Sequence, residues 1–181
     1  SVDSIGNAYV TGRTASTNFP TQNPYQATLR WGNDAFVTKI ASSGNLLTYS
    51  TYLGGNNDDE GYDIVVDSSG SAYLTGYTKS SDFPSYNAAQ PGYGGGFSDG
   101  FVTKVDSSAT FLSFSTFLGG TGEDVCTAVA IDSTGNTHVT GQTNSQNFPT
   151  QNSYQAAYGG GTSDAFVVKI NVVGYSFDYS T

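Results

Sequence analysis

The chain contains no methionine, a single cysteine and only six lysine and arginine residues. The lone Cys126 cannot form an intramolecular disulfide, so cysteine chemistry does not fix the redox compartment. The basic residues are scattered and the net charge is −9, which argues against nucleic-acid binding, because the phosphate backbone requires a basic footprint. Attachment to anionic lipid is disfavoured for the same electrostatic reason.

Long apolar runs and helical periodicity are also missing. No segment approaches the run of about 18 apolar residues that a membrane-spanning helix needs. The absence of methionine indicates that the sequence starts downstream of an initiator, either because a leader was removed or because the chain is a fragment.

Glycine and aromatic residues are abundant instead. The 181 residues include 23 glycines, 13 tyrosines and 11 phenylalanines, with only 12% charged residues. Aromatic side chains favour strands, and glycine with Asn, Asp and Ser supplies turns, so we expect an all-β fold. An acidic chain rich in Ser, Thr and Asn suits an exported protein, and we expect an extracellular or cell-surface location.

One unit of about 65 residues occurs three times. Four motifs recur in the same order: Val/Ile-Asp-Ser-x-Gly, Asn/Asp-Phe-Pro, Asp-Ala/Gly-Phe-Val-x-Lys and Ser-Thr-Tyr/Phe-Leu-Gly-Gly. The first motif starts at residues 2, 66 and 131, and the second at 18, 82 and 147. The third starts at 34, 99 and 164, and the fourth at 50 and 115. This agreement divides the chain into repeats 1–65, 66–130 and 131–181, the third of which ends inside the last motif.

Each repeat predicts four short strands. The first, apolar at 64–66 and 128–131, is expected to be buried on both faces. Asp-Ser-Ser-Gly then predicts a turn in which Gly70 takes a positive φ. The second strand alternates, which places Tyr73 and Leu74 on opposite faces.

A connection of roughly twenty residues, carrying the Phe-Pro pair, leads to the remaining two strands. These are expected at 101–105 and 113–118 in the second repeat. A sheet of this kind has two apolar faces, which stacking against neighbours buries. We therefore predict a β-propeller-like array of three four-stranded antiparallel blades, with the first blade lacking its first strand.

The repeats resemble the β-propeller repeats known as SBBP, which occur in exported and cell-surface proteins of bacteria and some archaea. The residues that carry the resemblance are 66–70, 72–76, 82–84, 100–104 and 115–120. The resemblance covers essentially the whole chain, and what it implies is architectural, because that family's repeats are mostly found in proteins without an assigned biochemical role. No catalytic residues come with it.

Three blades cannot close a ring, since propellers have about four to eight. The outward faces of the first and third blades are therefore expected to expose apolar surface. The chain is either a segment of a longer polypeptide, or part of a ring closed by several copies, or a unit that adds head to tail into a filament by β-strand addition. The edges for such assembly are Val2, Asp3, Tyr179 and Thr181.

The densest acidic cluster comprises Asp58, Asp59, Glu60 and Asp63. Its carboxylates could hold Ca²⁺, which takes six to eight oxygen ligands. The second repeat keeps only two of these acidic residues, and the spacing does not match an EF-hand loop. A solvated turn between blades is therefore the preferred interpretation, and no other cofactor is expected.

No constellation in the sequence indicates catalysis. Asp34 recurs in every repeat with a lysine five residues later, and this odd spacing sends the two side chains to opposite faces of a strand. Recurrence at a fixed period is typical of a scaffold, whereas catalytic sites are usually single. His138 replaces a tyrosine of the other repeats, and Cys126 takes the place of Gly61, so a packed ring and a small buried thiol are expected.

The long connections carry aromatic residues that could stack on sugars, with Asn and Gln amides beside them. The candidates are Tyr25, Trp31, Tyr93 and Tyr158. Trp31 is the best of them, since the other repeats have no counterpart. The alternative is that Phe-Pro and the tyrosines anchor each long loop onto its own blade.

These observations predict a non-enzymatic extracellular or cell-surface module with a structural or adhesive role. Its expected partners are other copies of itself or further blades of a longer chain. A carbohydrate-binding module that takes glycans on its aromatic loops is the second hypothesis. A blade set from a larger hydrolase or lyase is the third, disfavoured because no acid–base pair stands out.

Overall fold

A computed structural model describes all residues, 1–181, and shows eleven strands and no helix. The strands are β1 (Ala8–Thr14), β2 (Asp34–Ile40), β3 (Leu47–Leu53), β4 (Asp59–Val66), β5 (Ala72–Thr78), β6 (Asp99–Val105), β7 (Leu112–Leu118), β8 (Asp124–Ile131), β9 (Thr137–Thr143), β10 (Asp164–Ile170) and β11 (Phe177–Ser180). No helix is present that could cross a membrane.

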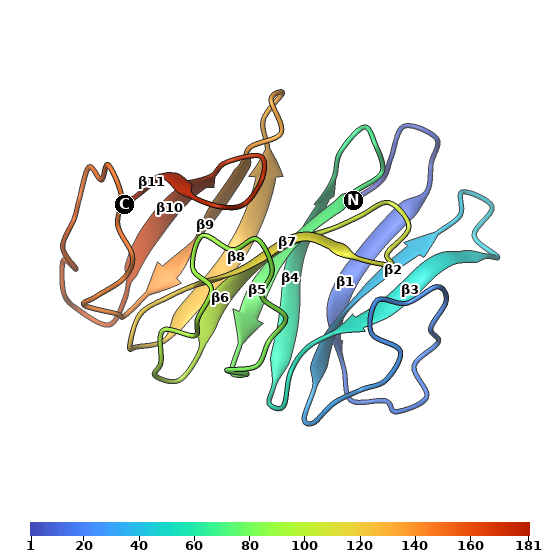
Figure 1. Cartoon of the computed structure of the whole chain (residues 1–181), viewed down its shortest axis with the longest axis horizontal. Coiled ribbons are helices and arrows are strands. Elements are labelled where there is room, and N and C mark those ends of the chain that lie inside the picture. Colours follow the sequence, from blue (N-terminus) through green and yellow to red (C-terminus); the bar gives the residue numbers. More distant parts are fainter.

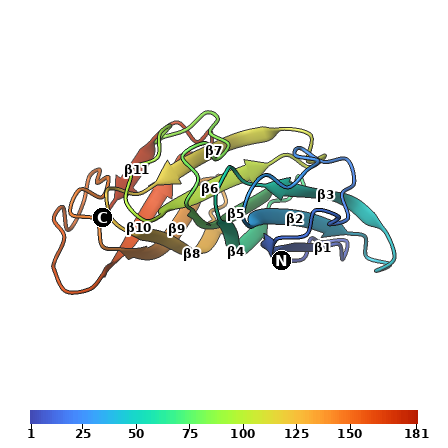
Figure 2. The same ribbon diagram turned by 90° about the horizontal axis from the view of Figure 1, so that it is seen from below.

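The strands form three separate antiparallel sheets, which follow one another along an arc (Figure 1). The strand orders are β1-β2-β3, β4-β5-β6-β7 and β11-β10-β9-β8. The predicted all-β array, with an incomplete first blade, is confirmed. We call the sheets blades 1, 2 and 3; seen from below, they fan out side by side (Figure 2).

The alternation of side chains along each strand creates one core on either side of blade 2. Leu74, Phe101 and Phe117 of blade 2 pack with residues of blade 1 such as Tyr9 and Val37. The opposite face of blade 2 packs against blade 3 in a second core that includes Tyr73, Val102, Phe114, Phe166 and Val168. The predicted placement of Tyr73 and Leu74 on opposite faces holds, because successive strand residues point to opposite sides.

The prediction that the first strand of each blade is buried on both faces is wrong for β4 and β8. In β8 both Ala128 and Ala130 are exposed, and in β4 Val65 and Val66 are only half-buried. The reason is position: each strand is an edge of its sheet and therefore lacks a pairing neighbour on one side. A bulge within each of the two strands also interrupts the inward-facing alternation.

The turn that follows each first strand is held by its aspartate. The Asp67 Oδ1 atom accepts hydrogen bonds from the backbone amides of Ser69 and Ser71, at 2.9 and 3.0 Å. Gly70 has the expected positive φ, 83°, which a side chain would disfavour. The repeat boundaries at 66 and 131 coincide with these turns, so each blade's first strand lies in the preceding repeat unit.

The Phe-Pro pairs anchor the long connections. Phe83 is buried and its ring centroid lies 4.6 Å from that of Phe101. The equivalent distances are 4.6 Å between Phe148 and Phe166 and 4.9 Å between Phe19 and Phe36. These connections are therefore part of the packed scaffold, as the anchoring interpretation predicts.

Candidate functional site

Blade 1 turns an apolar face away from the rest of the molecule. Its Val10 occupies the position of Leu74 in blade 2; Val10 is 39% exposed, whereas Leu74 is 0% exposed. Phe36 likewise matches Phe101, which is buried against blade 1. A shallow cavity of about 240 Å³ lies on this face, lined by Val10, Phe19, Pro20, Phe36, Ile40 and Leu47 among others. We call this surface the blade 1 face.

Blade 3 exposes the face that points away from blade 2. Its Val167 is 42% exposed, whereas the matching Val102 of blade 2 is 0% exposed because blade 3 covers it. The blade 3 face also carries His138 and Tyr179, at the positions of Tyr73 and Phe114. The exposed apolar faces expected at both ends of the array are thus present.

A lysine–aromatic–aspartate cluster recurs in each blade. In blade 2 the Lys104 Nζ atom lies 4.6 Å from the ring centroid of Tyr73 and 3.4 Å from Asp67 Oδ2. The lysines therefore pair with the turn aspartates, and not with the aspartates that open the same strands. Blade 1 repeats the arrangement, with 3.8 Å between Lys39 Nζ and Asp3 Oδ2.

Blade 3 has a histidine in this cluster. His138 Nε2 lies 3.3 Å from Asp132 Oδ2, and its Nδ1 lies 3.2 Å from the Tyr179 hydroxyl. Hydrogen bonds, foremost that from the Thr134 side chain, hold the pKa of Asp132 well below its usual range. His138 is half-buried and has no nucleophile among its partners, so the arrangement is that of a packed polar cluster.

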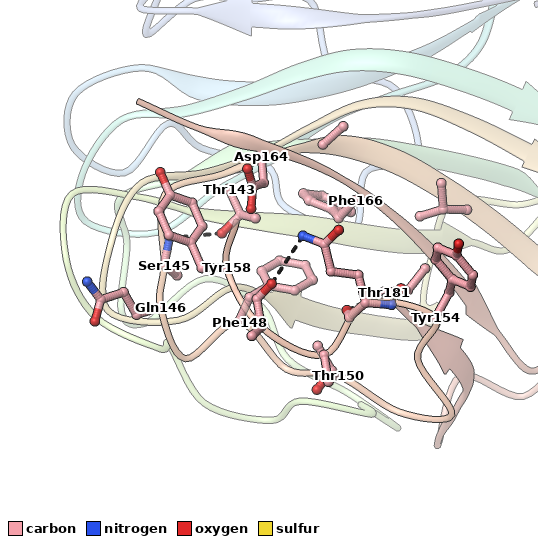
Figure 3. A pocket seen from close by; sticks show the side chains of 15 residues that line it. Thr143, Ser145, Gln146, Phe148, Thr150, Tyr154, Tyr158, Asp164, Phe166 and Thr181 are labelled. Carbon is pink, nitrogen blue, oxygen red and sulfur yellow. Dashed lines mark hydrogen bonds between the residues drawn. The ribbon is translucent and has the colours of Figure 1, made fainter. Parts of the chain in front are cut away.

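A second cavity of about 240 Å³ opens beside β10, where β11 ends (Figure 3). Phe148 and Phe166 form its floor, while Tyr154 and Tyr158 lie on opposite sides of it. In blade 2 the equivalent phenylalanine, Phe83, is covered by Phe117 and Tyr93, which lie in mutual contact. The cavity therefore corresponds to the place that an aromatic side chain of the fourth strand occupies in blade 2.

The free edge of β1 carries a related feature. A Cβ on Gly76 of β5 would lie 1.8 Å from the carbonyl oxygen of Glu60, and one on Gly141 of β9 would lie 2.0 Å from that of Val125. These glycines admit the bulged first strand. Gly12 holds the same position on β1, but the nearest atom to its Cβ would be a Phe36 ring carbon at 3.1 Å. Val2, a predicted assembly residue, forms only an isolated bridge with Ala8 beside this edge.

The four acidic candidates for calcium are directed to different partners. Asp58 accepts a hydrogen bond from the Asn33 side chain and lies 3.6 Å from Lys79. Glu60 forms an ion pair with Arg13 at 2.9 Å.

The other two members point elsewhere. Asp59 is buried and accepts hydrogen bonds from Gly55, Thr78 and Ser80. Asp63 Oδ2 accepts the Val129 amide at 2.9 Å. No three acidic, histidine or cysteine side chains gather into a metal-sized group, and a calcium site at these residues stays a prediction.

The aromatic candidates for sugar binding are distributed over all three blades. Trp31 is 75% exposed and Tyr25 is also exposed, both in the connection between β1 and β2. Tyr93 packs on Phe117 with ring centroids 5.9 Å apart, in blade 2. Tyr158 lines the blade 3 cavity, and its hydroxyl donates to the Gly161 carbonyl at 3.0 Å. Only Trp31 and Tyr25 share a loop, so the four do not form one site.

Cys126 is fully buried in the core between blades 2 and 3, and burial raises the pKa of its thiol to about 12. A thiol in this state is a poor nucleophile. Its place in β8 matches that of Gly61 in β4, as the repeat predicts.

The sequence analysis did not predict that aspartates opening strands of neighbouring blades lie close together. Asp34 and Asp59 meet at the joint between blades 1 and 2, and Asp99 and Asp124 meet between blades 2 and 3. A Cβ on Gly54 would lie 2.6 Å from Asp34 Oδ1 and 2.7 Å from Asp59 Oδ2. The sequence does contain a signal: both members of the first pair recur one repeat later, as Asp99 and Asp124.

Two segments of the chain match a known family. The SBBP beta-propeller repeat family matches at residues 48–84 and again at residues 114–149. No curated protein matches the chain. Both matched segments run from the fourth strand of one blade, across the joint, through the first two strands of the next blade to the Phe-Pro pair. Residues 48–84 and 114–149 thus carry SBBP beta-propeller repeats, and the three sheets of the chain are consistent with a propeller-like arrangement of blades.

Proposed function

We propose that this chain is a non-catalytic structural module of an exported or cell-surface protein, which associates with further copies of its own repeat. The association combines stacking of blade faces with addition of a strand to the free edge of blade 1. The acidic composition with few charged residues supports the exported location, and cell fractionation tests it.

The complementarity of the two free faces carries this proposal. The blade 1 face presents, at Val10 and Phe36, the positions that in blade 2 are buried on blade 1. The blade 3 face presents, at Val167 and Tyr179, the positions that in blade 2 are buried on blade 3. The blade 3 face of one copy can therefore stack on the blade 1 face of the next as the blades stack within the chain. Such head-to-tail contacts build a ring if they close and a filament if they do not.

Strand addition is supported at the free edge of blade 1, whose sheet has three strands. Gly12 leaves the β1 edge open to a bulged first strand, because it lacks the close carbonyl contact that Gly76 and Gly141 make. At blade 3 the four strands β8 to β11 are already paired, so strand addition is proposed for the β1 edge. Main-chain pairing of this kind gives affinity.

The oligomeric state tests the proposal. We expect the mass in sedimentation velocity to rise with concentration, and Val10→Lys or Val167→Lys to weaken association at least about tenfold, because the lysine charge would be buried without a partner. Leu46→Lys is the matched control: Leu46 is exposed in the turn between β2 and β3 and does not line the cavity of the blade 1 face. A chain that stays monomeric at every concentration, or face variants that associate like the control, would contradict the proposal.

The absence of a catalytic role is supported by the partners of the reactive side chains. His138 forms hydrogen bonds with Asp132 and Tyr179, and Cys126 is buried in the core.

Carbohydrate binding is the second candidate function, favoured by one observation. Trp31 is 75% exposed in a loop that also holds the exposed Tyr25, which is the kind of platform on which a sugar ring stacks. Glycan-array binding that is lost in Trp31→Ala and kept in Tyr154→Ala, a change at another exposed aromatic residue, would support it. No binding at millimolar sugar would rule it out.

A further inference from the structure

Two carboxyl groups from neighbouring blades face each other at the joint between blades 1 and 2. Asp34 opens β2 and Asp59 opens β4, and both side chains are fully buried. Gly54 lies between them, where any side chain would collide with Asp34 Oδ1 and Asp59 Oδ2. The glycine therefore lets the two carboxyls approach.

The same arrangement recurs at the joint between blades 2 and 3. Asp99 opens β6 and Asp124 opens β8, and both are again fully buried. A Cβ on Gly119 would lie 2.9 Å from Asp99 Oδ1 and 2.8 Å from Asp124 Oδ2. A feature built twice from the same repeat positions is part of how the blades join.

The hydrogen bonds of these carboxyls are incomplete in a specific way. Asp34 Oδ2 accepts from the Gln26 side chain at 2.6 Å and from the Arg30 amide at 3.1 Å, but Asp34 Oδ1 has no donor. At the second joint, the Oδ1 atoms of both Asp99 and Asp124 have no donor. Each joint thus holds at least one buried oxygen that lacks a hydrogen-bond partner and faces a second carboxyl.

Two adjacent buried carboxylates would both carry a desolvation penalty and would repel each other, so one of them is expected to be neutral. From this geometry we propose that each blade joint holds one proton, shared by its pair of aspartates, and that the proton binds the blades to each other. The proton removes one charge and supplies the donor that the unpartnered oxygen lacks. The inference does not depend on association between copies.

Other charged groups near the first joint do not neutralise the pair. The Arg30 guanidinium lowers the pKa of Asp34, but it pairs with Asp82 at 3.3 Å, and the effect of burial on Asp34 is larger. Lys79 is engaged by Asp58, the chain neighbour of Asp59, at 3.6 Å.

At the second joint no lysine or arginine is among the groups that shift the pKa of Asp99. The titratable groups facing it are Asp124, the Tyr93 phenol and the Cys126 thiol. Neither the phenol nor the thiol is charged at neutral pH, because burial raises the pKa of each to about 12.

The direction of titration agrees with the geometry. Burial raises the pKa of Asp59 and of Asp99 to about 7, and it raises the pKa of Asp34 as well. Because Asp34 and Asp59 titrate together, the proton they share belongs to the pair and not to one residue. The folded state keeps this proton when the unfolded chain has lost it, so its contribution to stability is complete below the unfolded pKa of about 3.9. That contribution is lost as the pH rises through about 7.

Thermal unfolding of the whole chain between pH 5 and pH 8.5 tests the proposal. We expect the wild-type Tm to fall by at least about 5 °C across this range. The Asp34→Asn/Asp99→Asn double variant should have a nearly constant Tm, because an amide is neutral at every pH and can donate as the protonated acid does. Asp164→Asn is the matched control: Asp164 opens β10 at the same repeat position but is only half-buried, so wild-type pH dependence should remain.

If the double variant does not fold, the wild type still decides the matter. Infrared spectra should show the carbonyl stretch of a protonated carboxyl group at pH 6, and this band should disappear by pH 9. A wild-type Tm that is constant with pH, a double variant with wild-type pH dependence, or the absence of the band would overturn the proposal. Calcium chloride that raises the wild-type Tm at pH 8, but not that of the double variant, would also overturn it in favour of a bound cation.

Discussion

At the scale of single residues, glycine decides where backbones can approach. Gly76 admits the carbonyl of Glu60 at the bulge of β4, Gly54 admits two carboxyls, and Gly70 provides a positive φ. The sequence shows only that these glycines recur. The contacts that require them come from strands and side chains distant in the sequence, so their separate roles emerge only in the folded chain.

The equivalent glycines Gly76 and Gly12 give a matched pair for mutation. Gly76→Ala should lower the free energy of unfolding by about 1–3 kcal/mol or more, because its methyl group would overlap the Glu60 carbonyl and the backbone cannot easily yield. Gly12→Ala should cost much less, since its methyl group would meet only the Phe36 ring. Urea denaturation measures both changes, and equal losses would contradict this account.

At the scale of elements, each long connection behaves as part of its blade. The Phe-Pro pair places a ring on the third strand, and backbone bridges such as that between Tyr86 and Ser115 attach the loop to the fourth strand. The repetition of Phe-Pro was sufficient to predict anchoring. Which loop is also covered by a neighbouring blade could not be read from it, because that depends on the order of blades in the array.

Phe83 and Phe19 test this difference. Phe83→Ala should lower the free energy of unfolding by about 3–5 kcal/mol, as expected for a buried phenylalanine. Phe19, at the same repeat position, lies on the partly exposed blade 1 face, so Phe19→Ala should cost roughly half as much or less. Chemical denaturation of monomeric protein is the measurement. A loss for Phe19→Ala as large as that for Phe83→Ala would contradict this account.

At the scale of the whole molecule, blade 2 is the only blade with a core on each side. Its inner strands β5 and β6 are buried along nearly their entire length, while β1 and β11 belong to blades with one free face. Stability in arrays of this kind is close to a sum over units and their joints. The central blade is therefore expected to open last.

Hydrogen exchange followed by mass spectrometry can resolve this order. Amides of β5 and β6 should exchange at least about tenfold more slowly than those of β1 and β11, because local opening requires less free energy at the ends of the array. Exchange should be measured at a concentration where the chain is monomeric, since association would cover the free faces. Equal protection of β1 and β5 would contradict the prediction.

The sequence by itself determined the threefold repeat, the four strands of a unit, the alternation of Tyr73 with Leu74 and the incomplete first blade. These properties follow from local periodicity and from the repetition of motifs, which need no knowledge of distant contacts. It also indicated that Asp34, Asp99 and Asp164 belong to the scaffold.

Only the tertiary structure decided how blades meet. Asp34 and Asp59 stand 25 residues apart in the chain and belong to different sheets, so no strand or turn pattern links them. The exposure of Val10 and of Val167 likewise depends on which blade has a neighbour, not on the residues themselves. Burial is a property of the assembled array, and for this reason the partly exposed edges of β4 and β8, the free faces and the paired carboxyls appeared only when the three blades were stacked.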